Sequence, residues 1–170
     1  FNKSHSVAYA LVAYETAYLK AHWRAQYYAA FLNSIIGDSD KLSWYISVCK
    51  NDNIKILAPD VNESGRDFTV LPNKTIRFGL AGIKSTGGAA VEAIISARSE
   101  DGPFTSLTDF CCRVNMRVVN KRVVEHLIKS GAMDSFGARR SQLLAVLDQA
   151  IDLGAACQRD RANGQLGLFG

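Results

Sequence analysis

The sequence predicts a mainly helical fold with a small β element, in the α+β class. Apolar residues recur every three or four positions along most of the chain, which favours helices. Short β-prone runs between residues 54 and 78 interrupt that rhythm, and glycine-containing turns separate the helical segments that follow. With 170 residues, of which 48% are hydrophobic, the chain can form a core of its own.

The first third of the chain is expected to be helical. Residues 4–36 have the apolar spacing of two consecutive helices, and Gly37 is expected to end the second. Asn2 or Ser4 has a side chain suited to capping the first helix. A third helix is expected over residues 39–50.

The β-prone runs predict a small sheet or hairpin. Residues 54–57 and 68–70 are rich in apolar β formers, and residues 75–78 alternate polar with apolar side chains. Pro59 and Pro72 are expected in the turns between them.

From Gly79 onward, short helices joined by tight turns are expected. Asn120 and Ser141 have the side chains of N-caps. Residues 158–164 are charged and contain glycine, so they are expected to fray or to form a flexible link. The helices are expected over residues 89–98, 107–114, 121–130 and 140–162.

A net charge of +4 is too small to identify a nucleic-acid partner. Between residues 113 and 140, however, seven basic residues against only two acidic ones, Glu125 and Asp134, leave a local charge of +5. Phosphate contacts are therefore expected in this window. Its basic residues are Arg113, Arg117, Lys121, Arg122, Lys129, Arg139 and Arg140.

Residues 79–91 place glycines on both sides of a short turn that leads directly into a helix. Backbone N–H groups at such a helix start can bind a phosphate, and glycine allows the close approach of a nucleic-acid backbone. A turn that binds nothing has the same pattern, so both interpretations stay open at this point.

A second turn, residues 130–137, suggests a tandem helix-hairpin-helix module whose two hairpins grip the two backbones of a DNA duplex. Asp134 in this turn would repel phosphate. The flanking Lys129, Arg139 and Arg140 are therefore expected to contribute more than the backbone of the turn.

No complete active site is evident. His5, His22 and His126 are far apart in the sequence and lie in no catalytic motif, and surface or structural roles are expected for His22 and His126. Asp38 and Asp40 fit the start of a helix.

The cysteines predict reduced thiols and no metal site, because none of them forms a C-x-x-C pair. Apolar runs fall short of the roughly 18 residues that a membrane-spanning helix needs, so a soluble, cytoplasmic protein without a membrane partner is expected. The chain starts without methionine, and we expect it to be a fragment. The cysteines are Cys49, Cys111, Cys112 and Cys157.

Residues 1–22 resemble the end of the fingers domain in bacterial DNA polymerase III alpha subunits, the C-family of replicative polymerases. The resemblance covers essentially the whole chain. It implies the end of the fingers over residues 1–50, a β connecting element over 51–78, the tandem helix-hairpin-helix module over 79–157 and a tail over 158–170. Further matches lie at residues 54–62, 76–84, 102–104 and 119–123.

The resemblance also implies roles for individual residues. Lys3, Ser4 and His5 would help to place the phosphates of an incoming nucleotide, for which a point charge and a hydroxyl are suited. The catalytic carboxylates that hold Mg²⁺ lie in the family's palm domain, before residue 1, so this piece is expected to have no catalytic residues, metal or cofactor. From the glycine-rich turn and the basic window, the expected DNA-binding residues are Lys84, Ser85, Thr86, Gly87, Gly88, Arg117, Lys121, Arg122, Lys129, Arg139 and Arg140.

Two segments depart from the family pattern. Residues 84–88 read Lys-Ser-Thr-Gly-Gly where the family commonly has Lys-Gly-Val-Gly-Glu, so Ser85 replaces the first hairpin glycine. Residues 22–24 read His-Trp-Arg where it usually has His-Tyr-Pro. Without the proline, a longer or smoother helix junction is expected at Arg24.

Residues 165–169, Gln-Leu-Gly-Leu-Phe, resemble the sliding-clamp-binding motif of bacterial replication proteins. Gln165 would orient the peptide, while Leu166, Leu168 and Phe169 would fill apolar pockets. The resemblance implies duplex DNA, the sliding clamp and, through the parent protein, other replisome subunits as partners.

Two other classes are compatible with parts of the sequence. A non-enzymatic helix-hairpin-helix adaptor of a repair protein would explain the hairpins but not residues 1–22. A helical protein-interaction domain would make the basic window a solvated face.

Overall fold

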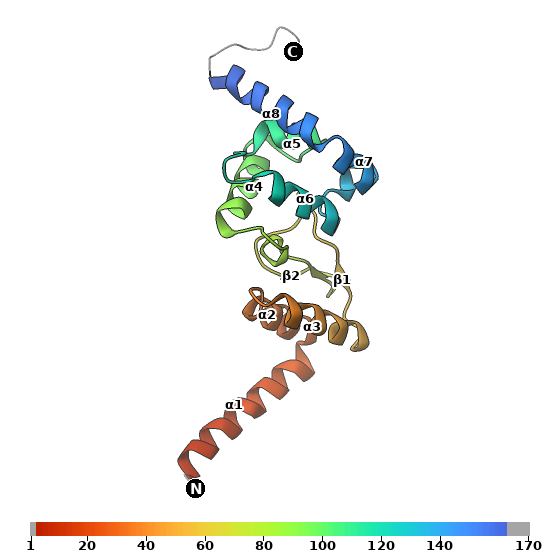
Figure 1. Ribbon diagram of the computed structural model, residues 1–170. Coiled ribbons are helices and arrows are strands. Elements are labelled where there is room, and N and C mark those ends of the chain that lie inside the picture. The colour runs from red at the N-terminus through yellow and green to blue at the C-terminus, as the bar shows by residue number, and fades with distance from the viewer. Residues whose placement is uncertain (1–2, 163–170) are drawn as a thin grey trace. The chain divides into compact units, whose positions relative to one another are not determined.

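The computed structural model describes residues 3–162 and confirms the mainly helical class with a small sheet (Figure 1). The chain divides into two compact units. The N-terminal unit takes in the chain up to residue 57 together with residues 68–77, and the C-terminal unit takes in residues 58–67 and the chain from residue 78.

The N-terminal unit combines helices with the sheet. Tyr28, Leu32, Cys49 and Ile76 are the most deeply buried side chains of this unit. Its elements are α1 (Lys3–His22), α2 (Arg24–Ser34), α3 (Ser39–Asn51), β1 (Ile56–Leu57), β2 (Thr69–Val70) and β3 (Ile76–Arg77).

The predicted sheet is confirmed, with the order β1-β3-β2. β1 pairs in parallel with β3, and β2 pairs with it antiparallel. Asn33 on α2 fixes the entry to β2, because its side-chain amide donates to the carbonyl oxygen of Phe68 (3.0 Å) and accepts from the Phe68 N–H (2.7 Å).

Two local predictions for the helices of this unit need correction. Ser4 lies inside α1 and does not cap it, while Asn2, the other expected cap, lies outside the described residues. The junction after α1 is not smoothed either, because Trp23 has φ −131° and ψ 58°, outside the helical region, and separates α1 from α2. The expected cap of α3 is confirmed: Asp38 Oδ1 accepts from the Lys41 N–H at 3.1 Å.

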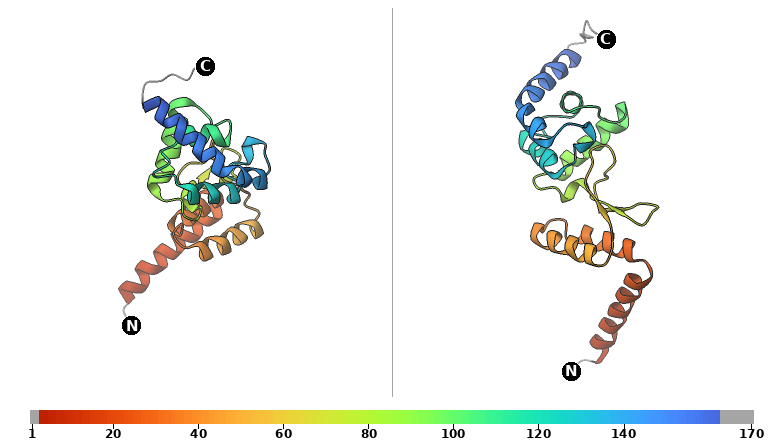
Figure 2. Two further views of the ribbon diagram at one scale, coloured as in Figure 1. Left: turned by 45° about the horizontal axis from the view of Figure 1, so that its top comes forward. Right: turned by 90° about the vertical axis from the view of Figure 1, so that its right-hand side faces the viewer.

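The C-terminal unit is built from short helices around one apolar core. Leu80, Val91, Phe110, Val124 and Leu127 are completely buried in it. α8 packs closely on α5 (Figure 2). The elements are η1 (Leu80–Gly82), α4 (Gly88–Asp101), α5 (Leu107–Arg113), α6 (Lys121–Ser130), η2 (Asp134–Phe136), α7 (Arg140–Ala145) and α8 (Leu147–Ala162), where η denotes a 3₁₀-helix.

The single helix expected from residue 140 onward is divided in two. Val146 ends α7, and its N–H bonds back to the carbonyl oxygens of Gln142 and Leu144. Leu143 and Leu147, on either side of this bend, are both buried, so the division lets both pack into the core. Ser141 is not the cap that was expected, since Arg139 occupies the N-cap position of α7.

Gln158 is ordered, although it was expected to begin a flexible tail. It lies inside α8, and its side-chain amide donates to the carbonyl oxygens of Cys111 (2.9 Å) and Val114 (2.6 Å) at the end of α5. The last described turns of α8 are thereby attached to α5.

Candidate nucleic-acid interface

The first predicted hairpin consists of η1, a turn over residues 83–87, and α4. Its turn is closed by a hydrogen bond from the Thr86 N–H to the Ile83 carbonyl oxygen, at 3.1 Å. Lys84 and Ser85 are exposed, and Gly87 is the N-cap of α4. This arrangement places an exposed turn at the positively polarised end of a helix of 14 residues, which suits an anion.

Ser85 has a backbone conformation that favours glycine. Its φ is 65°, in the left-handed region, where a residue with a Cβ is strained by roughly 1–2 kcal/mol. The family pattern has glycine at this place. Having serine in place of the family's glycine therefore adds backbone strain to the turn, but the turn still forms.

Thr86 does not present its side chain to solvent. It is 5% exposed, and its hydroxyl has no hydrogen-bond partner among residues 3–162. Any contact from Thr86 to a ligand on the surface would have to come from its backbone.

Arg66 is a basic residue at the first hairpin that the sequence did not indicate. A Cβ on Gly88 would lie 3.7 Å from both terminal guanidinium nitrogens of Arg66, so this cation stands beside the first residue of α4. It also pairs with Glu92 on the same helix, at 3.4 Å. No sequence signal could have found it, because Arg66 precedes the hairpin in an irregular segment.

The second hairpin consists of α6, a turn at Gly131, and η2 followed by α7. Arg140 covers this turn with a two-pronged bond to Asp134: Nε to Oδ1 at 2.9 Å and Nη2 to Oδ2 at 2.6 Å. This pairing lowers the pKa of Asp134 below its ordinary value and raises that of Arg140. Glycine is favoured at residue 131 by its φ of 86°, in the left-handed region, and a Cβ there would meet the guanidinium of Arg140, so that flexible side chain would have to shift.

The two hairpins therefore differ in what they offer to a phosphate. The first has an exposed turn beside the guanidinium of Arg66. The second has its acidic residue neutralised by Arg140, as Asp134 and Arg140 satisfy each other. Arg140 is thus bound within the hairpin, although it was expected among the main phosphate contacts of this turn.

The remaining predicted cations fall into two groups. Lys121 pairs with Asp148 (2.5 Å), and Lys129 pairs with Glu125 (3.5 Å). The second group is exposed and forms no ion pair with any part of the chain that the structure describes. It consists of Lys84, Arg117, Arg122 and Arg139.

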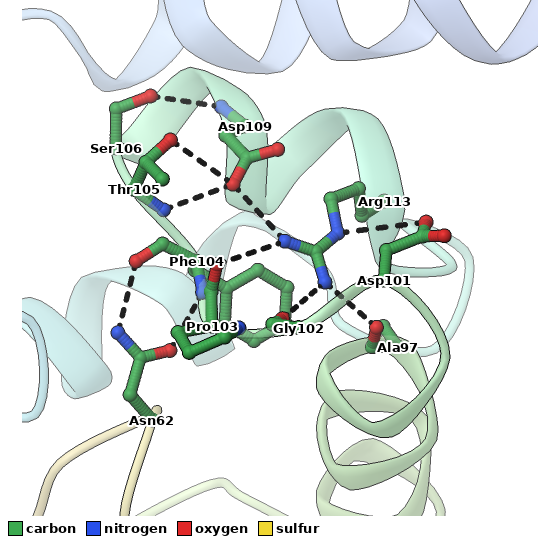
Figure 3. Close-up of polar contacts among 10 residues, drawn as sticks. All are labelled: Asn62, Ala97, Asp101, Gly102, Pro103, Phe104, Thr105, Ser106, Asp109 and Arg113. Atoms are coloured by element: carbon green, nitrogen blue, oxygen red, sulfur yellow. Dashed lines mark hydrogen bonds and ion pairs between the residues drawn. The ribbon is translucent and has the colours of Figure 1, made fainter.

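Arg113 corrects the prediction of phosphate contacts throughout the basic window. Its side chain is 5% exposed and turns inward, 4.5 Å from the ring centre of Phe104 (Figure 3). Its partners are the carbonyl oxygens of Ala97 (2.8 Å), Gly102 (2.5 Å) and Pro103 (3.3 Å) and the carboxylates of Asp109 (3.1 Å) and Asp101 (3.7 Å). Arg113 is a structural residue that ties α5 to the end of α4.

Lys3, Ser4 and His5 lie together in the first turn of α1, in the N-terminal unit, and all three are exposed. The clamp-like residues Gln165, Leu166, Leu168 and Phe169 lie outside the described residues.

The cysteine side chains are free thiols. Burial raises the pKa of Cys49 to about 11 and that of Cys111 to about 12. Burial and a hydrogen bond with Cys157 raise the pKa of Cys112 to about 11. These three thiols therefore stay protonated at neutral pH, which makes them poor nucleophiles.

No three His, Cys, Asp or Glu side chains between residues 3 and 162 gather in a way that could hold a metal ion. Over the same residues, no helix has the length and apolar character needed to cross a bilayer.

Comparison with known proteins matches residues 53–143 to the helix-hairpin-helix motif family. The chain is also 46% identical, over 169 residues, to the DNA polymerase III subunit alpha of Neisseria meningitidis serogroup B, covering 99% of this chain and 15% of the relative. Its identity to the Thermus aquaticus subunit is 45%, with 99% of this chain and 14% of the relative covered. The Vibrio cholerae subunit is 40% identical over 170 residues, with 100% and 15% covered.

The chain thus spans about one seventh of the length of these curated relatives, and the match includes both units. The chain belongs to the helix-hairpin-helix family, in the form found within DNA polymerase III alpha subunits.

Proposed function

We propose that this chain is a piece of a DNA-directed DNA polymerase and that its C-terminal unit binds the duplex made by that enzyme. The identity of 40–46% to DNA polymerase III alpha subunits, over nearly the whole chain, carries this proposal. It extends through residues 1–52, which precede the helix-hairpin-helix match, and a repair adaptor would leave that part unexplained.

Duplex binding is supported by the exposed cations of the C-terminal unit. Lys84 lies at the first hairpin, while Arg117 and Arg122 flank the start of α6 and Arg139 precedes α7. Because their side chains are not held by ion pairs within the described residues, they can neutralise phosphates without losing an internal contact. Lys121, Lys129 and Arg140 would have to exchange a carboxylate partner for a phosphate.

Duplex affinity is expected to depend steeply on salt. If those four cations neutralise four phosphates, the logarithm of the affinity should fall with the logarithm of the salt concentration with a slope of about −4. The double change Lys84→Ala, Arg122→Ala should reduce the magnitude of that slope by about 2. Fluorescence anisotropy of a labelled duplex, titrated at several salt concentrations, measures both.

The matched control is Lys41→Ala, Lys50→Ala, which removes the same charge from exposed positions on α3. It should leave the slope unchanged. Equal effects of the two double changes, or an affinity that does not change with salt, would contradict duplex binding by the C-terminal unit.

We further propose that residues 165–169 tether the parent polymerase to the sliding clamp. Three apolar side chains after an orienting amide are suited to a peptide that fills pockets in an extended form. A peptide this short should bind at micromolar strength, about −8 kcal/mol, and would act mainly by raising the local concentration of the enzyme at DNA.

For the tether, changing Leu168 and Phe169 to alanine is expected to abolish measurable binding of the chain to a bacterial sliding clamp in surface plasmon resonance. Leu153→Ala is the control, because Leu153 is an equally apolar residue, 57% exposed on α8 and outside the motif. If the double variant binds the clamp as the Leu153 variant does, the tether is excluded.

Lys3, Ser4 and His5 are proposed to approach the phosphates of the incoming nucleotide in the parent enzyme. The two-metal chemistry that the family implies would be supplied by Mg²⁺. The described residues do not fit such a centre, because they bring no three metal-binding side chains together. Clamp and other replisome partners, and a cytoplasmic location, belong to the proposal for the parent protein.

A further inference from the structure

The N-terminal unit contains a pocket of about 600 Å³ that none of the proposals above uses. Three separate segments line it: residues 21–26 at the junction of α1 and α2, residues 53–55 before β1, and residues 73–75 in the β2–β3 turn. The pocket is large enough for a small organic ligand, since such sites measure roughly 300–1,000 Å³.

The lining of this pocket is basic. Arg24, Lys55 and Lys74 contribute cations from the three segments, and the lining includes no aspartate or glutamate. Arg24 is 3.5 Å from Asp52, which lies just outside the lining and also accepts a hydrogen bond from Tyr28. Lys55 and Lys74 are exposed and have no carboxylate partner within residues 3–162. The pocket therefore favours an anionic ligand.

Hydrogen bonds fix the backbone of the β2–β3 turn, which carries Lys74. Lys74 has φ 61°, in the left-handed region, and its N–H bonds to the Leu71 carbonyl oxygen at 2.9 Å. Asn73 Oδ1 accepts from both the N–H and the hydroxyl of Thr75, at 3.2 and 2.6 Å. These bonds fix the point at which the Lys74 side chain leaves the backbone, whether or not a ligand is bound.

Trp23 adds an aromatic surface to the same pocket. Its side chain is 48% exposed, and its ring lies 5.9 Å from that of Tyr18 and 5.8 Å from that of His22. Both rings contact the indole, while about half of the Trp23 side chain stays exposed. Proteins that bind single strands combine exposed aromatic rings, which stack on bases, with cations, which contact the phosphates.

We propose that this pocket binds one nucleotide of a single-stranded nucleic acid, with the base stacked on Trp23 and the flanking phosphates held by Lys55 and Lys74. A duplex cannot use the site in this way, because its base faces are covered by stacking within the helix. The pocket lies in the N-terminal unit and the proposed duplex-binding residues lie in the C-terminal unit, so the two proposals can be tested independently.

The experiment uses tryptophan fluorescence in a Trp44→Phe background. The chain has two tryptophans, and Trp44 lies outside the pocket, so this change leaves Trp23 as the only reporter. Titration with a short oligodeoxythymidylate should quench the emission to saturation. Two phosphate contacts should give a salt slope of about −1.4. Trp23→Ala, followed by anisotropy of a labelled oligonucleotide, should weaken binding by roughly 5- to 150-fold.

Lys74→Glu should also weaken binding, whereas Lys50→Glu, the same charge change on α3 outside the pocket, should leave it unchanged. Circular dichroism of each variant checks that the fold is retained. Equal weakening by both lysine changes would overturn the proposal. Equal quenching by a duplex of the same length would also overturn it. Equal quenching by free deoxythymidine triphosphate would overturn it too, and would assign the site to a free nucleotide.

Discussion

Arg113→Ala is expected to destabilise the C-terminal unit by about 3 kcal/mol, because several hydrogen bonds of one buried, charged guanidinium are lost together. The guanidinium of Arg113 closes the end of α4 by bonding to the carbonyl oxygens of Ala97 and Gly102, and it pairs with Asp109 on its own helix. Alanine would remove the donor that these oxygens share. The measurement is urea unfolding followed by circular dichroism.

Two further variants make this prediction specific. Arg113→Lys keeps the charge but has one ammonium in place of a planar fork, so its stability should fall between those of the wild type and the alanine variant. Arg117→Ala removes an exposed arginine from the same basic window and should change stability by no more than about 0.5 kcal/mol. A loss below about 1 kcal/mol for Arg113→Ala would mean that Arg113 does not join α5 to α4.

Arg113 also shows where sequence reasoning about function reaches its limit. In the sequence, Arg113 and Arg117 belong to one run of cations, and nothing local distinguishes them. Arg113 turns inward because it is the last residue of α5, where it reaches the end of α4 and the face of Phe104. These partners come from contacts between helices, which spacing along one helix cannot reveal.

The parts that were predictable depend on local physical chemistry. Asn120 caps α6 as expected, since its side chain accepts from the Val123 N–H at 3.2 Å. The turn expected over residues 130–137 was also placed correctly, since α6 ends at Ser130 and Gly131 follows in the left-handed conformation. The departure at Ser85 was visible in the sequence, but its φ of 65° was not, because a turn's backbone angles depend on the elements on either side.

The structural role of Gly154 could not be predicted from the sequence. A glycine within a helix usually indicates a weak point, costing about 1 kcal/mol relative to alanine. In α8, however, a Cβ at this position would lie 2.7 Å from the backbone and Cβ of Cys111 on α5. The glycine therefore allows the backbones of the two helices to approach closely, and Gln158, one turn later, adds a hydrogen bond to α5.

Gly154→Val is accordingly expected to destabilise the C-terminal unit by about 3 kcal/mol, because backbone atoms of α5 cannot move aside as a flexible side chain would. Helix propensity alone predicts the reverse, a small gain, since valine is a better helix former than glycine. Thermal unfolding of the variant therefore decides between the two effects by its sign. Ala155→Val, the same new side chain at an exposed position of α8, should cost no more than about 0.7 kcal/mol. If Gly154→Val raises the unfolding temperature, α8 does not rest on α5 at this residue.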